Sequence, residues 1–513
     1  MVSLPVGIRW SVIPIIWIAG LAAIVTSLEL DIRDSRSLID AAATTVENMF
    51  SNYTSLNGKF SPLLTGHKHP DEDMLTFDEG MLYLTLIQFW NTTEIASYNS
   101  LINKRLRKPL NDSDAPITLE RTQNQALGAW GLASITAAEM NYPELDDKSS
   151  WLQVAAHVLA ILTSQTWDVN TCRGGLRMDW EWFPKDALSN GLFFQLAARL
   201  ALATSGDESR DYARWANEIW EWSVRSQILD EKKWSVIMSV TNSTEGGACS
   251  PHNLQEWSYA YGLYLSGAAY MYKATNGLSW NERADGLLQS TMERFFIDNI
   301  MTEFGPRGSF GTDVTITNNM KGMVGLLSAS LVTVANLLPE TAEQIVPRLR
   351  ATAVAAAKQC SGSANGTVCG SEWTKPTYDG DPGLGSSMSA VNLFVSILIL
   401  PEGQEKELSD GEIAGIAVGS GSGVAIIATA IFLLVRRRGK GKKGAVSDSE
   451  YAPCIRRSCL QVRTVDSALE VRLHIPFKLY KSLGKLGTDS CFEFKLTARS
   501  LKLSGSLQAA GGS

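Results

Sequence analysis

The sequence predicts an all-α fold for most of the chain, from residue 35 to residue 400. Apolar residues recur there at spacings of three and four, as they do on one face of a helix, in one segment after another. Gly, Pro, Asn and Asp interrupt the pattern between segments, for example in the run Asn141-Tyr-Pro-Glu. Alternation of apolar and polar residues, which would indicate strands, is scarce in this region.

The first predicted helix runs from Ser37 to Phe50, and its apolar residues keep the helical spacing. Short sequence repeats are not visible, which argues against a solenoid of identical units. Eleven or twelve helices could form a helical toroid or a large bundle, and the periodicity does not distinguish the two. Ten further segments follow the same pattern and leave room for a twelfth: 79–91, 120–141, 149–165, 187–204, 208–227, 256–274, 279–297, 318–338, 341–359 and 386–400.

The first 27 residues have the pattern of a signal peptide. Arg9 precedes an apolar run from Trp10 to Val25, and small residues follow up to Ser27. An uncleaved membrane anchor is the alternative interpretation of this segment. Cleavage would leave residues 28–402 as a helical ectodomain, followed by a polar, acidic linker at 403–412.

A second apolar run, from Ile413 to Val435, contains 23 residues without a charge. This length spans the roughly 30 Å hydrocarbon core of a bilayer as one transmembrane helix. Basic residues follow from Arg436 onward, and such flanks stay in the cytosol. A signal for a glycolipid anchor would end in the apolar run, whereas 78 residues follow it here. The sequence therefore predicts a type I, single-pass membrane protein of the secretory pathway, at the cell surface or in endomembranes, whose one helix contacts lipid.

The tail after the apolar run, residues 436–513, contains 16 basic and 6 acidic residues and so carries a charge of +10. Because the whole chain carries −7, the rest of the chain is strongly acidic. An acidic body does not favour nucleic-acid binding, which needs a basic face. From Cys454 the tail has alternating apolar residues and many Lys and Ser. We interpret it as a largely disordered cytosolic tail or as translated intron sequence.

Glycosylation motifs and cysteines agree with this topology. The Asn-x-Ser/Thr acceptors all precede the apolar run: Asn52, Asn91, Asn111, Asn242 and Asn365. Four cysteines lie in the same region, where disulfides can form: Cys172, Cys249, Cys360 and Cys369. The last two are nine residues apart, which suggests a local pair and would leave the first two together. Four cysteines allow three pairings, however, and the sequence alone does not choose among them.

Several kinds of site are not predicted. The five histidines have no close Cys or His partners at the spacing of a zinc site. The run Gly419-Ser-Gly-Ser-Gly lies within the apolar segment, where it cannot cradle a phosphate. The Gly-x-Ser-x-Gly motif of serine hydrolases is not found. We therefore expect neither a metal nor another cofactor.

Tryptophan is frequent in the predicted ectodomain, and aromatic faces stack on sugar rings. In the run Asp179-Trp180-Glu181-Trp182, two carboxylates stand beside two indoles in a stretch without helical spacing. This composition indicates a loop of a sugar-binding cleft, and a solvated turn is the alternative. For tryptophans within helical segments, such as Trp215, packing between helices is favoured.

Several segments, taken in order over about residues 28–400, resemble the fungal endo-1,6-α-mannanase family, glycoside hydrolase family 76. The resemblance rests on Asn124-Gln-Ala-Leu-Gly-Ala-Trp-Gly, on Cys172-Arg-Gly-Gly-Leu-Arg and on six further segments at 189–199, 257–262, 267–272, 321–322, 369–374 and 385–390. Each segment alone is weak, but the ordered set is specific. The resemblance implies an (α/α)6 barrel and a substrate with α-1,6-linked mannose, either cell-wall mannan or the glycan of GPI anchors.

The chain departs from the family at the positions that carry the chemistry. The family's pattern reads Asn-Asp-Asp-Gln-Gly-Phe-Trp-Gly, and the adjacent aspartates act as nucleophile and acid/base. Aligned on Asn124, Gly128 and Trp130, these two positions hold Gln125 and Ala126 here. A retaining glycosidase needs one carboxylate to attack and another to move a proton. Glutamine cannot ionise and alanine has no hydrogen-bonding group in its side chain, so the resemblance leaves open whether the chain is an enzyme.

Three interpretations follow. In the first, the chain is a cell-surface homologue that no longer has the aspartate pair but acts on or binds mannose-rich glycans, with these candidate binding residues: Asn124, Trp130, Asp179, Trp180, Trp182 and Tyr259. In the second, it is an active endo-1,6-α-mannosidase or transglycosidase with substitute carboxylates, for which Glu120, Asp179 and Glu181 are candidates. In the third, it is a membrane-tethered structural or protein-binding ectodomain.

Overall fold

The structure is a computed structural model, which describes residues 28–53, 75–107, 109, 122–143, 150–178, 184–242, 248–303, 318–362 and 367–401, and strands of the tail between residues 454 and 509. The chain divides into two units, residues 1–404 and 405–513. The predicted signal peptide, the linker and the apolar run at 413–435 lie outside the described residues. Within the part that is described, no helix combines the length and the apolar character needed to cross a bilayer.

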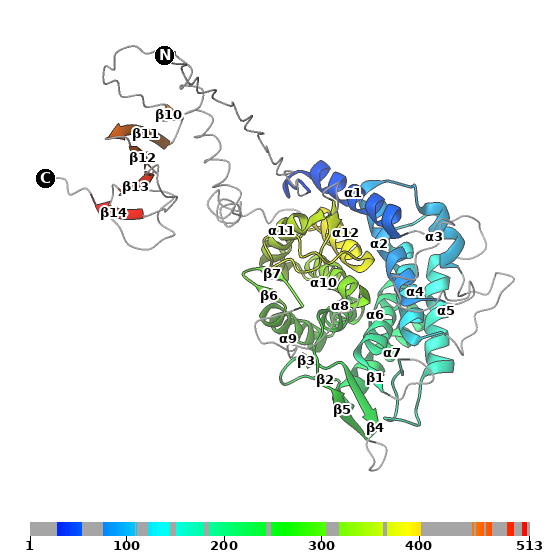
Figure 1. Ribbon diagram of the computed structural model, residues 1–513. Coiled ribbons are helices and arrows are strands. Elements are labelled where there is room, and N and C mark those ends of the chain that lie inside the picture. The colour runs from blue at the N-terminus through cyan, green and yellow to red at the C-terminus, as the bar shows by residue number, and fades with distance from the viewer. Residues whose placement is uncertain are drawn as a thin grey trace, which may run out of the picture. The chain divides into compact units, whose positions relative to one another are not determined.

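Six of the helices described in the first unit form a closed inner ring, in which each helix packs against the next (Figure 1). Most of their side chains are buried whichever way they point, as expected of helices that are covered on all sides. The ring closes where Nδ2 of Asn392 donates a hydrogen bond of 3.0 Å to the hydroxyl of Thr85. In order around the ring the helices are α2 (Phe77–Thr93), α4 (Asn124–Glu139), α6 (Ala187–Ala203), α8 (Ser258–Thr275), α10 (Asn318–Leu337) and α12 (Leu384–Leu398).

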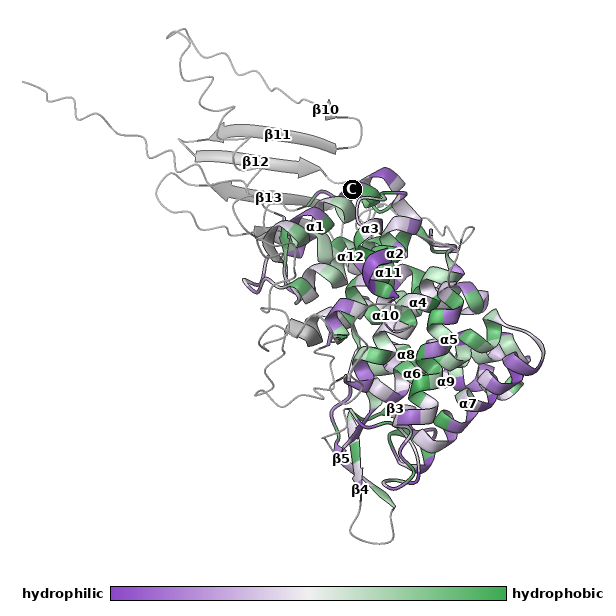
Figure 2. Ribbon diagram, turned by 90° about the vertical axis from the view of Figure 1, so that its right-hand side faces the viewer, coloured by the Kyte–Doolittle hydropathy of each residue, from purple (hydrophilic) through white to green (hydrophobic). Residues whose placement is uncertain are grey.

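The remaining helices of this unit lie outside the ring. Each is apolar on one side only: along α7, Ala216, Ile219 and Trp220 are buried, while charged residues face outward (Figure 2). Alternation of inner and outer helices makes an α/α barrel, as the resemblance implies. The outer helices are α1 (Ser35–Tyr53) on α12, α3 (Asn99–Leu106) on α2 and α4, α5 (Trp151–Ile161) on α4, α7 (Gly206–Arg225) on α6, α9 (Leu278–Arg294) on α8 and α11 (Ala342–Gln359) on α10 and α12. A π-helical turn, Leu162–Thr166, continues α5.

Glycine allows two pairs of inner helices to approach closely. A Cβ added at Gly128 in α4 would lie 2.7 Å from the Cβ of Leu192 in α6. A Cβ added at Gly325 in α10 would lie 2.8 Å from the Cα of Ser389 in α12. Because packed interiors leave little room for such overlap, even alanine would force these helices apart.

Short strands lie in the connections that lead from an outer helix to the next inner helix. β1 (Lys185–Asp186) directly precedes α6 and pairs with β4 (Ser239–Asn242), which pairs with β5 (Cys249–Asn253) ahead of α8. These strands therefore gather where inner helices begin, and we call that end of the barrel, around the first residues of α4, α6 and α8, the mouth. The other antiparallel pairs are β2–β3 (Leu229–Asp230 with Ser235–Val236), β6–β7 (Phe296–Ile297 with Ile300–Met301) and β8–β9 (Cys360–Gly362 with Val368–Cys369).

Two disulfides fasten these connections. Cys172, in the connection before β1, is bonded to Cys249 at the start of β5. Cys360 and Cys369 are bonded across the β8–β9 pair. The structure thus selects one of the three pairings that the sequence allowed, and it is the pairing with the local bridge.

In the second unit, the described residues form one antiparallel sheet with its strands in chain order. The sequence predicted a largely disordered tail, and for these residues the structure has strands instead. The alternation of apolar residues noted after Cys454 is the pattern that favours strands. The strands are β10 (Cys454–Ile455), β11 (Ser458–Val465), β12 (Ala468–His474), β13 (Ser490–Leu496) and β14 (Gly505–Ala509).

Candidate active site

The first turn of α4 holds the positions at which the resemblance expects two aspartates. Asn124, the first residue of the helix, is buried. Its backbone N–H donates to the carbonyl of Met178 (3.0 Å), and its Nδ2 donates to the carbonyl of Arg177 (2.9 Å). Its Oδ1 is buried and finds no hydrogen-bond partner in the part of the chain that is described. Asn124 thus fixes the segment that ends at Met178 against the start of α4.

Gln125 reaches from α4 to the beginning of α6. Its Nε2 donates a hydrogen bond of 3.1 Å to Oδ1 of Asp186. The side chain is partly exposed, and its Oε1 has no hydrogen-bond partner among the described residues. Ala126, which follows, is buried and contributes only a methyl group. The two positions therefore present an amide and no carboxylate.

Asp186 is the N-cap residue of α6. Its Oδ1 accepts from the backbone N–H of Ser189 (2.8 Å) and its Oδ2 from the hydroxyl of the same serine (2.7 Å), as an aspartate does at this position. The residue is only 6% exposed. Burial raises the pKa of Asp186, although the hydrogen bonds from Ser189 and Gln125 act in the opposite direction.

A second buried carboxyl group, Glu303, lies at the start of α8. Its Oε2 accepts from the backbone N–H of Ser258 (3.1 Å), and its Oε1 accepts from the hydroxyl of Ser258. Burial raises the pKa of Glu303 to about 7, against the lowering effect of these hydrogen bonds. The group is therefore close to half protonated at neutral pH.

Tyr259 lies near both carboxyl groups. Burial, and then the charges of Asp186 and Glu303, raise the pKa of Tyr259 well above its usual value, so its phenol stays protonated. The Tyr259 hydroxyl has no hydrogen-bond partner among the described residues. Residues of α4, α6 and α8 thus bring an amide, a carboxyl group and a phenol together at the mouth.

Trp130 lies in the core and not at the mouth. Its side chain is fully buried, its indole N–H donates to the carbonyl of Thr76 (2.9 Å), and its ring meets Tyr83 edge-on with centroids 5.4 Å apart. A ring without exposed surface cannot stack on a sugar. The structure therefore gives Trp130 a packing role between α4 and α2, in place of the sugar contact predicted for it.

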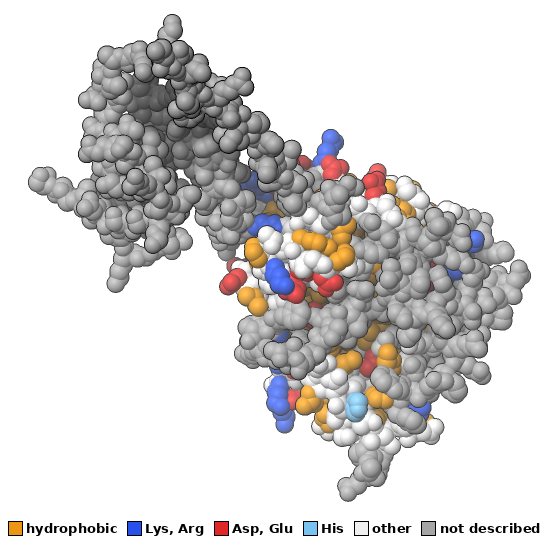
Figure 3. Space-filling model, viewed as in Figure 1, with side chains coloured by type: hydrophobic (Ala, Val, Ile, Leu, Met, Phe, Trp, Pro, Cys, Tyr) orange, Lys and Arg blue, Asp and Glu red, His pale blue; other side chains and the backbone are white. Residues whose placement is uncertain are grey.

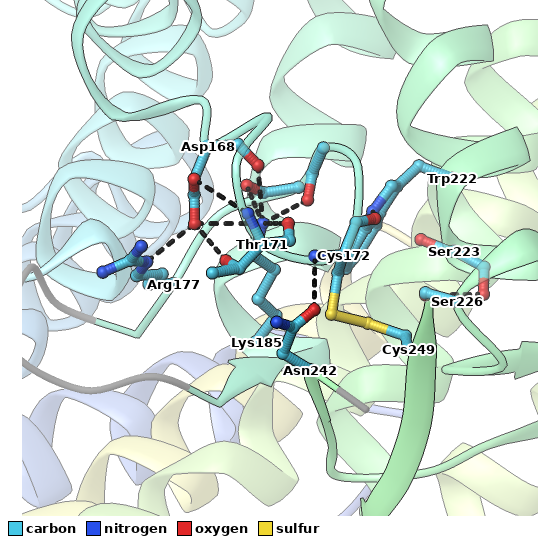
Figure 4. Close-up of a disulfide and its surroundings, with 12 residues drawn as sticks. Asp168, Thr171, Cys172, Arg177, Lys185, Trp222, Ser223, Ser226, Asn242 and Cys249 are labelled. Atoms are coloured by element: carbon cyan, nitrogen blue, oxygen red, sulfur yellow. Dashed lines mark hydrogen bonds and ion pairs between the residues drawn. A yellow bond between two sulfur atoms is a disulfide. The ribbon is translucent and has the colours of Figure 1, made fainter. Parts of the chain in front are cut away.

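Lys185, next to Asp186, fixes the loop that precedes β1 (Figure 4). Its side chain has no exposed surface. Its Nζ donates to the backbone carbonyls of Asp168 (2.7 Å), Thr171 (2.6 Å) and Gly175 (3.2 Å), and also to that of Gly174. Backbone carbonyls in place of water thus surround this buried cation.

Asp168 completes the same network (Figure 4). Its carboxylate lies 3.4 Å from Nζ of Lys185 and accepts from Nε of Arg177 (2.7 Å). Burial alone would raise the pKa of Asp168, but hydrogen bonds from Thr171 and Arg177 and the charge of Lys185 lower it to about 2. Burial lowers the pKa of Lys185 to about 8, although the charge of Asp168 opposes this. The network holds the segment whose end contacts Asn124.

Several predicted residues lie outside the described part of the chain. Residues 179–183 are among these, whereas Met178, which is described, accepts the hydrogen bond from Asn124. Of the glycosylation acceptors, Asn91 and Asn242 are exposed, and the side chain of Asn52 is not described. The site residues outside the description are Glu120, Asp179, Trp180, Glu181 and Trp182, and the acceptors are Asn111 and Asn365.

The sequence analysis did not identify Asp186 or Glu303. A signal for Asp186 was present, because Asp followed three residues later by Ser189 at the start of a predicted helix is a capping pattern. That pattern does not predict the contact with Gln125, which lies 61 residues earlier in the chain. Glu303 belongs to no motif. In the described part of the chain, no group of three or more His, Cys, Asp or Glu side chains could hold a metal ion.

Comparisons with known sequences agree with the resemblance. The model of glycosyl hydrolase family 76 matches residues 37–408. The mannan endo-1,6-α-mannosidase DCW1 of Candida glabrata is 29% identical over 419 residues, which cover 79% of this chain and 89% of that protein. DCW1 of Saccharomyces cerevisiae is 29% identical over 410 residues, with coverage of 77% and 86%.

Solved structures show the same fold. Dfg5 from Chaetomium thermophilum, in complex with glucosamine, is 28% identical with a TM-score of 0.63, and the match covers 72% of this chain and 92% of that chain. The α-1,6-mannanase of a Salegentibacter species has a TM-score of 0.55 at 16% identity, with coverage of 71% and 100%, and so shows the fold alone. A variant of that mannanase, with two adjacent aspartates replaced by alanine, is inactive and is in complex with α-1,6-mannotetrose; it is 17% identical with a TM-score of 0.55, and the match covers 71% of this chain and 99% of that chain.

Proposed function

The chain belongs to glycosyl hydrolase family 76, and on this basis we propose that its barrel binds mannose-rich glycans with α-1,6 links at the mouth. Fungal relatives that match most of the chain are mannan endo-1,6-α-mannosidases. Cell-wall mannan and the glycan of GPI anchors belong to this class of ligand. The proposed place of action is the cell surface.

Two polar atoms at the mouth have no hydrogen-bond partner among the described residues, and this observation carries the proposal. The Oε1 of Gln125 can accept a hydrogen bond, and the protonated hydroxyl of Tyr259 can donate one. Sugar hydroxyls, which both donate and accept, would pair with both atoms.

The residues at positions 125 and 126 support binding over the family's hydrolysis. Double displacement needs a carboxylate nucleophile and a second carboxyl group, and Gln125 and Ala126 supply neither. In the Salegentibacter mannanase, replacement of two adjacent aspartates by alanine gives an inactive protein that is found with its oligosaccharide. Loss of such a pair is therefore compatible with a site that still holds the glycan.

Hydrolysis with substitute carboxylates is the second candidate. Its predicted residues, Glu120, Asp179 and Glu181, lie outside the described part of the chain. Among the described residues, Asp186 is the carboxyl group bonded to Gln125, and its oxygens already accept the hydrogen bonds of a helix cap. This second candidate therefore rests on residues outside the described part of the chain.

The surface agrees with a neutral ligand. On the face drawn in Figure 3, acidic and basic side chains of the described residues lie interspersed. Nucleic acids require a basic patch, whereas neutral sugars are bound through hydrogen bonds and aromatic faces.

Isothermal titration of the ectodomain, residues 28–402, with α-1,6-mannotetraose tests the proposal. We expect binding without cleavage, and we expect Tyr259→Phe and Gln125→Ala each to weaken it about fivefold, since a hydrogen bond is worth about 1 kcal/mol. Gln289→Glu, on the exposed side of α9, is the control and should bind as the wild type does. Absence of binding would refute the proposal, and release of shorter oligosaccharides would favour the enzyme.

A further inference from the structure

We propose that the carboxylate of Asp186 requires an uncharged side chain, such as the amide of glutamine, at position 125. This part of the mouth then contains one carboxylate and not two. The inference rests on the proposed function and deepens it, because it explains how a site of this family is set for binding a neutral sugar. It concerns the combined negative charge of side chains 125 and 186, at the starts of α4 and α6, and not side chain 125 alone.

The position of Asp186 is fixed from several directions. Its Oδ1 accepts from Ser189 at 2.8 Å, in the same helix end that it caps. Its backbone belongs to β1, where it is paired with Ser239 of β4. Lys185, the residue before it, is held by four backbone carbonyls of the preceding loop. Asp186 therefore cannot turn away from Gln125 without breaking the cap.

A carboxylate at position 125 would meet Asp186 at short range. Glutamate has the shape of glutamine, so one of its oxygens would take the place of Nε2, which lies 3.1 Å from Oδ1 of Asp186. Two carboxylates at such a distance in a buried place cannot both ionise, and one of them keeps a proton. The amide of Gln125 avoids this conflict, because it offers an N–H to Asp186.

The nearest cation does not relieve the conflict. Lys185 directs its ammonium group at Asp168 and at the carbonyls of the loop, and not at the side chain of Asp186. The Asp186 carboxylate accepts hydrogen bonds from Ser189, Gln125 and the backbone N–H of Leu188, and none of these donors carries a charge. Replacing Gln125 by an acid would thus remove one donor and add a charge in a single step.

Asp186 also determines which way the amide of Gln125 faces. A carboxylate only accepts hydrogen bonds, so it selects the nitrogen of the amide as its partner. The carbonyl oxygen Oε1 is left to the mouth, where it has no partner among the described residues. Position 125 therefore presents a fixed acceptor, which suits a hydroxyl of a neutral sugar.

A double-mutant cycle on the intact protein tests this coupling: wild type, Gln125→Glu, Asp186→Asn and both together. Asparagine is chosen because it also caps helices well. We expect Gln125→Glu to lower the Tm by several degrees more at pH 8 than at pH 5, and we expect this pH-dependent loss to vanish when residue 186 is asparagine. The titratable groups beside the pair, Tyr259, Tyr264 and Glu303, are the same in all four proteins and cancel in the comparison.

Equal losses from Gln125→Glu at both pH values and in both backgrounds would overturn the inference. Should Asp186→Asn fold poorly, Asp186→Ser keeps a capping hydroxyl without the charge and completes the same cycle. Gln289→Glu, an exposed substitution of the same chemistry in α9, should show no pH-dependent loss.

Titration of the same proteins with α-1,6-mannotetraose separates this inference from the proposed function. If the wild type binds the glycan but the double-mutant cycle shows no coupling between positions 125 and 186, the inference is rejected and the proposed function stands. A clear coupling without glycan binding would keep the inference about charge and reject the function. If both the coupling and glycan binding are found, Gln125→Glu should weaken binding several-fold, because the hydrogen bond to Asp186 that fixes the direction of side chain 125 is lost.

Discussion

The ammonium group of Lys185 lies 3.4 Å from the carboxylate of Asp168, at a position where the lysine has no exposed surface. The loop that surrounds them turns sharply: Cys172, Arg173, Gly174 and Gly175 all have positive φ angles. Such backbone leaves carbonyls that no helix or strand pairs, and Lys185 supplies their donor. The loop in turn ends at the residues that contact Asn124, so the start of α4 at the mouth depends on a cation with no exposed surface.

Replacement of Lys185 by methionine should therefore destabilise the protein strongly. The change removes the donor of the Thr171 and Gly174 carbonyls and one of the two cations beside Asp168, which keeps Arg177. A buried polar group left unpaired costs about 1–3 kcal/mol. Urea unfolding followed by tryptophan fluorescence measures the loss. Lys232→Met, on an exposed turn, is the control, and an equal effect of the two would contradict the role of Lys185.

The stability of the barrel should depend on pH through Glu303. Its folded pKa of about 7 lies above the value of 4.5 expected in the unfolded chain, so the folded state binds the proton more tightly. Stability should then fall as pH rises from about 4.5 to 7, by an amount on the order of 3 kcal/mol from this group, and level off above that range. Thermal unfolding at several pH values, compared with Glu303→Gln, measures it. An unchanged pH profile in the variant would rule out this assignment.

Asp168 should give a pH dependence of the opposite sign and at lower pH. Its folded pKa of about 2 lies below that of the unfolded chain, so its contribution is present above about pH 4 and is lost as pH falls toward 2. Asp168→Asn should therefore be less stable than the wild type at pH 6, and the two should converge near pH 2. Circular dichroism along an acid titration follows this difference, and parallel curves would speak against it.

The two disulfides should differ in their contribution to stability. Cys172 and Cys249 are 77 residues apart, whereas Cys360 and Cys369 are nine apart. In the chain-entropy account a longer closed loop gains more, so removing the first bridge with two serines should cost about 4 kcal/mol and removing the second less. Chemical denaturation of the two double variants makes the comparison. A larger loss from the short bridge would show that local packing outweighs the closure of the loop.

Glycosylation should be detectable at the two exposed acceptors. Asn91 at the end of α2 and Asn242 at the end of β4 are both exposed, as an enzyme that transfers a glycan requires. Asn91→Gln and Asn242→Gln should each remove the mass of one glycan from the protein expressed in a secretory host. Digestion with an N-glycosidase followed by mass spectrometry tests this, and unchanged masses would argue against passage through the secretory route.

Much of the barrel was predictable because apolar spacing is a local property. The segments expected at 187–204 and 318–338 are the helices Ala187–Ala203 and Asn318–Leu337. The helix Asn99–Leu106 was not predicted, because it has eight residues with little apolar periodicity. Closure of the ring, in which α12 meets α2, follows from contacts distant in sequence, and only the family resemblance pointed to it.

The site was less predictable than the fold. Gln125 was identified because the resemblance assigned a role to its position, but its partner Asp186 caps another helix, and the capping pattern does not indicate their contact. Trp130 was predicted to contact sugar because it lies near Gln125 in the sequence, but its ring is buried in the core. The sequence does not indicate which way an aromatic ring faces. Side-chain direction depends on how α2, α4 and α6 pack, and that arrangement has no local signature in the sequence.

The disulfide between Cys172 and Cys249 closes a covalent loop of the chain that contains all of α6 and α7. A protease that cuts the chain once between these two cysteines would produce two fragments that remain linked. They would migrate as one band on a gel without reductant and separate only after a thiol is added. Such a nicked molecule would differ from the intact one only by one added water, so a gel run under oxidising conditions would not reveal that its polypeptide had been cut.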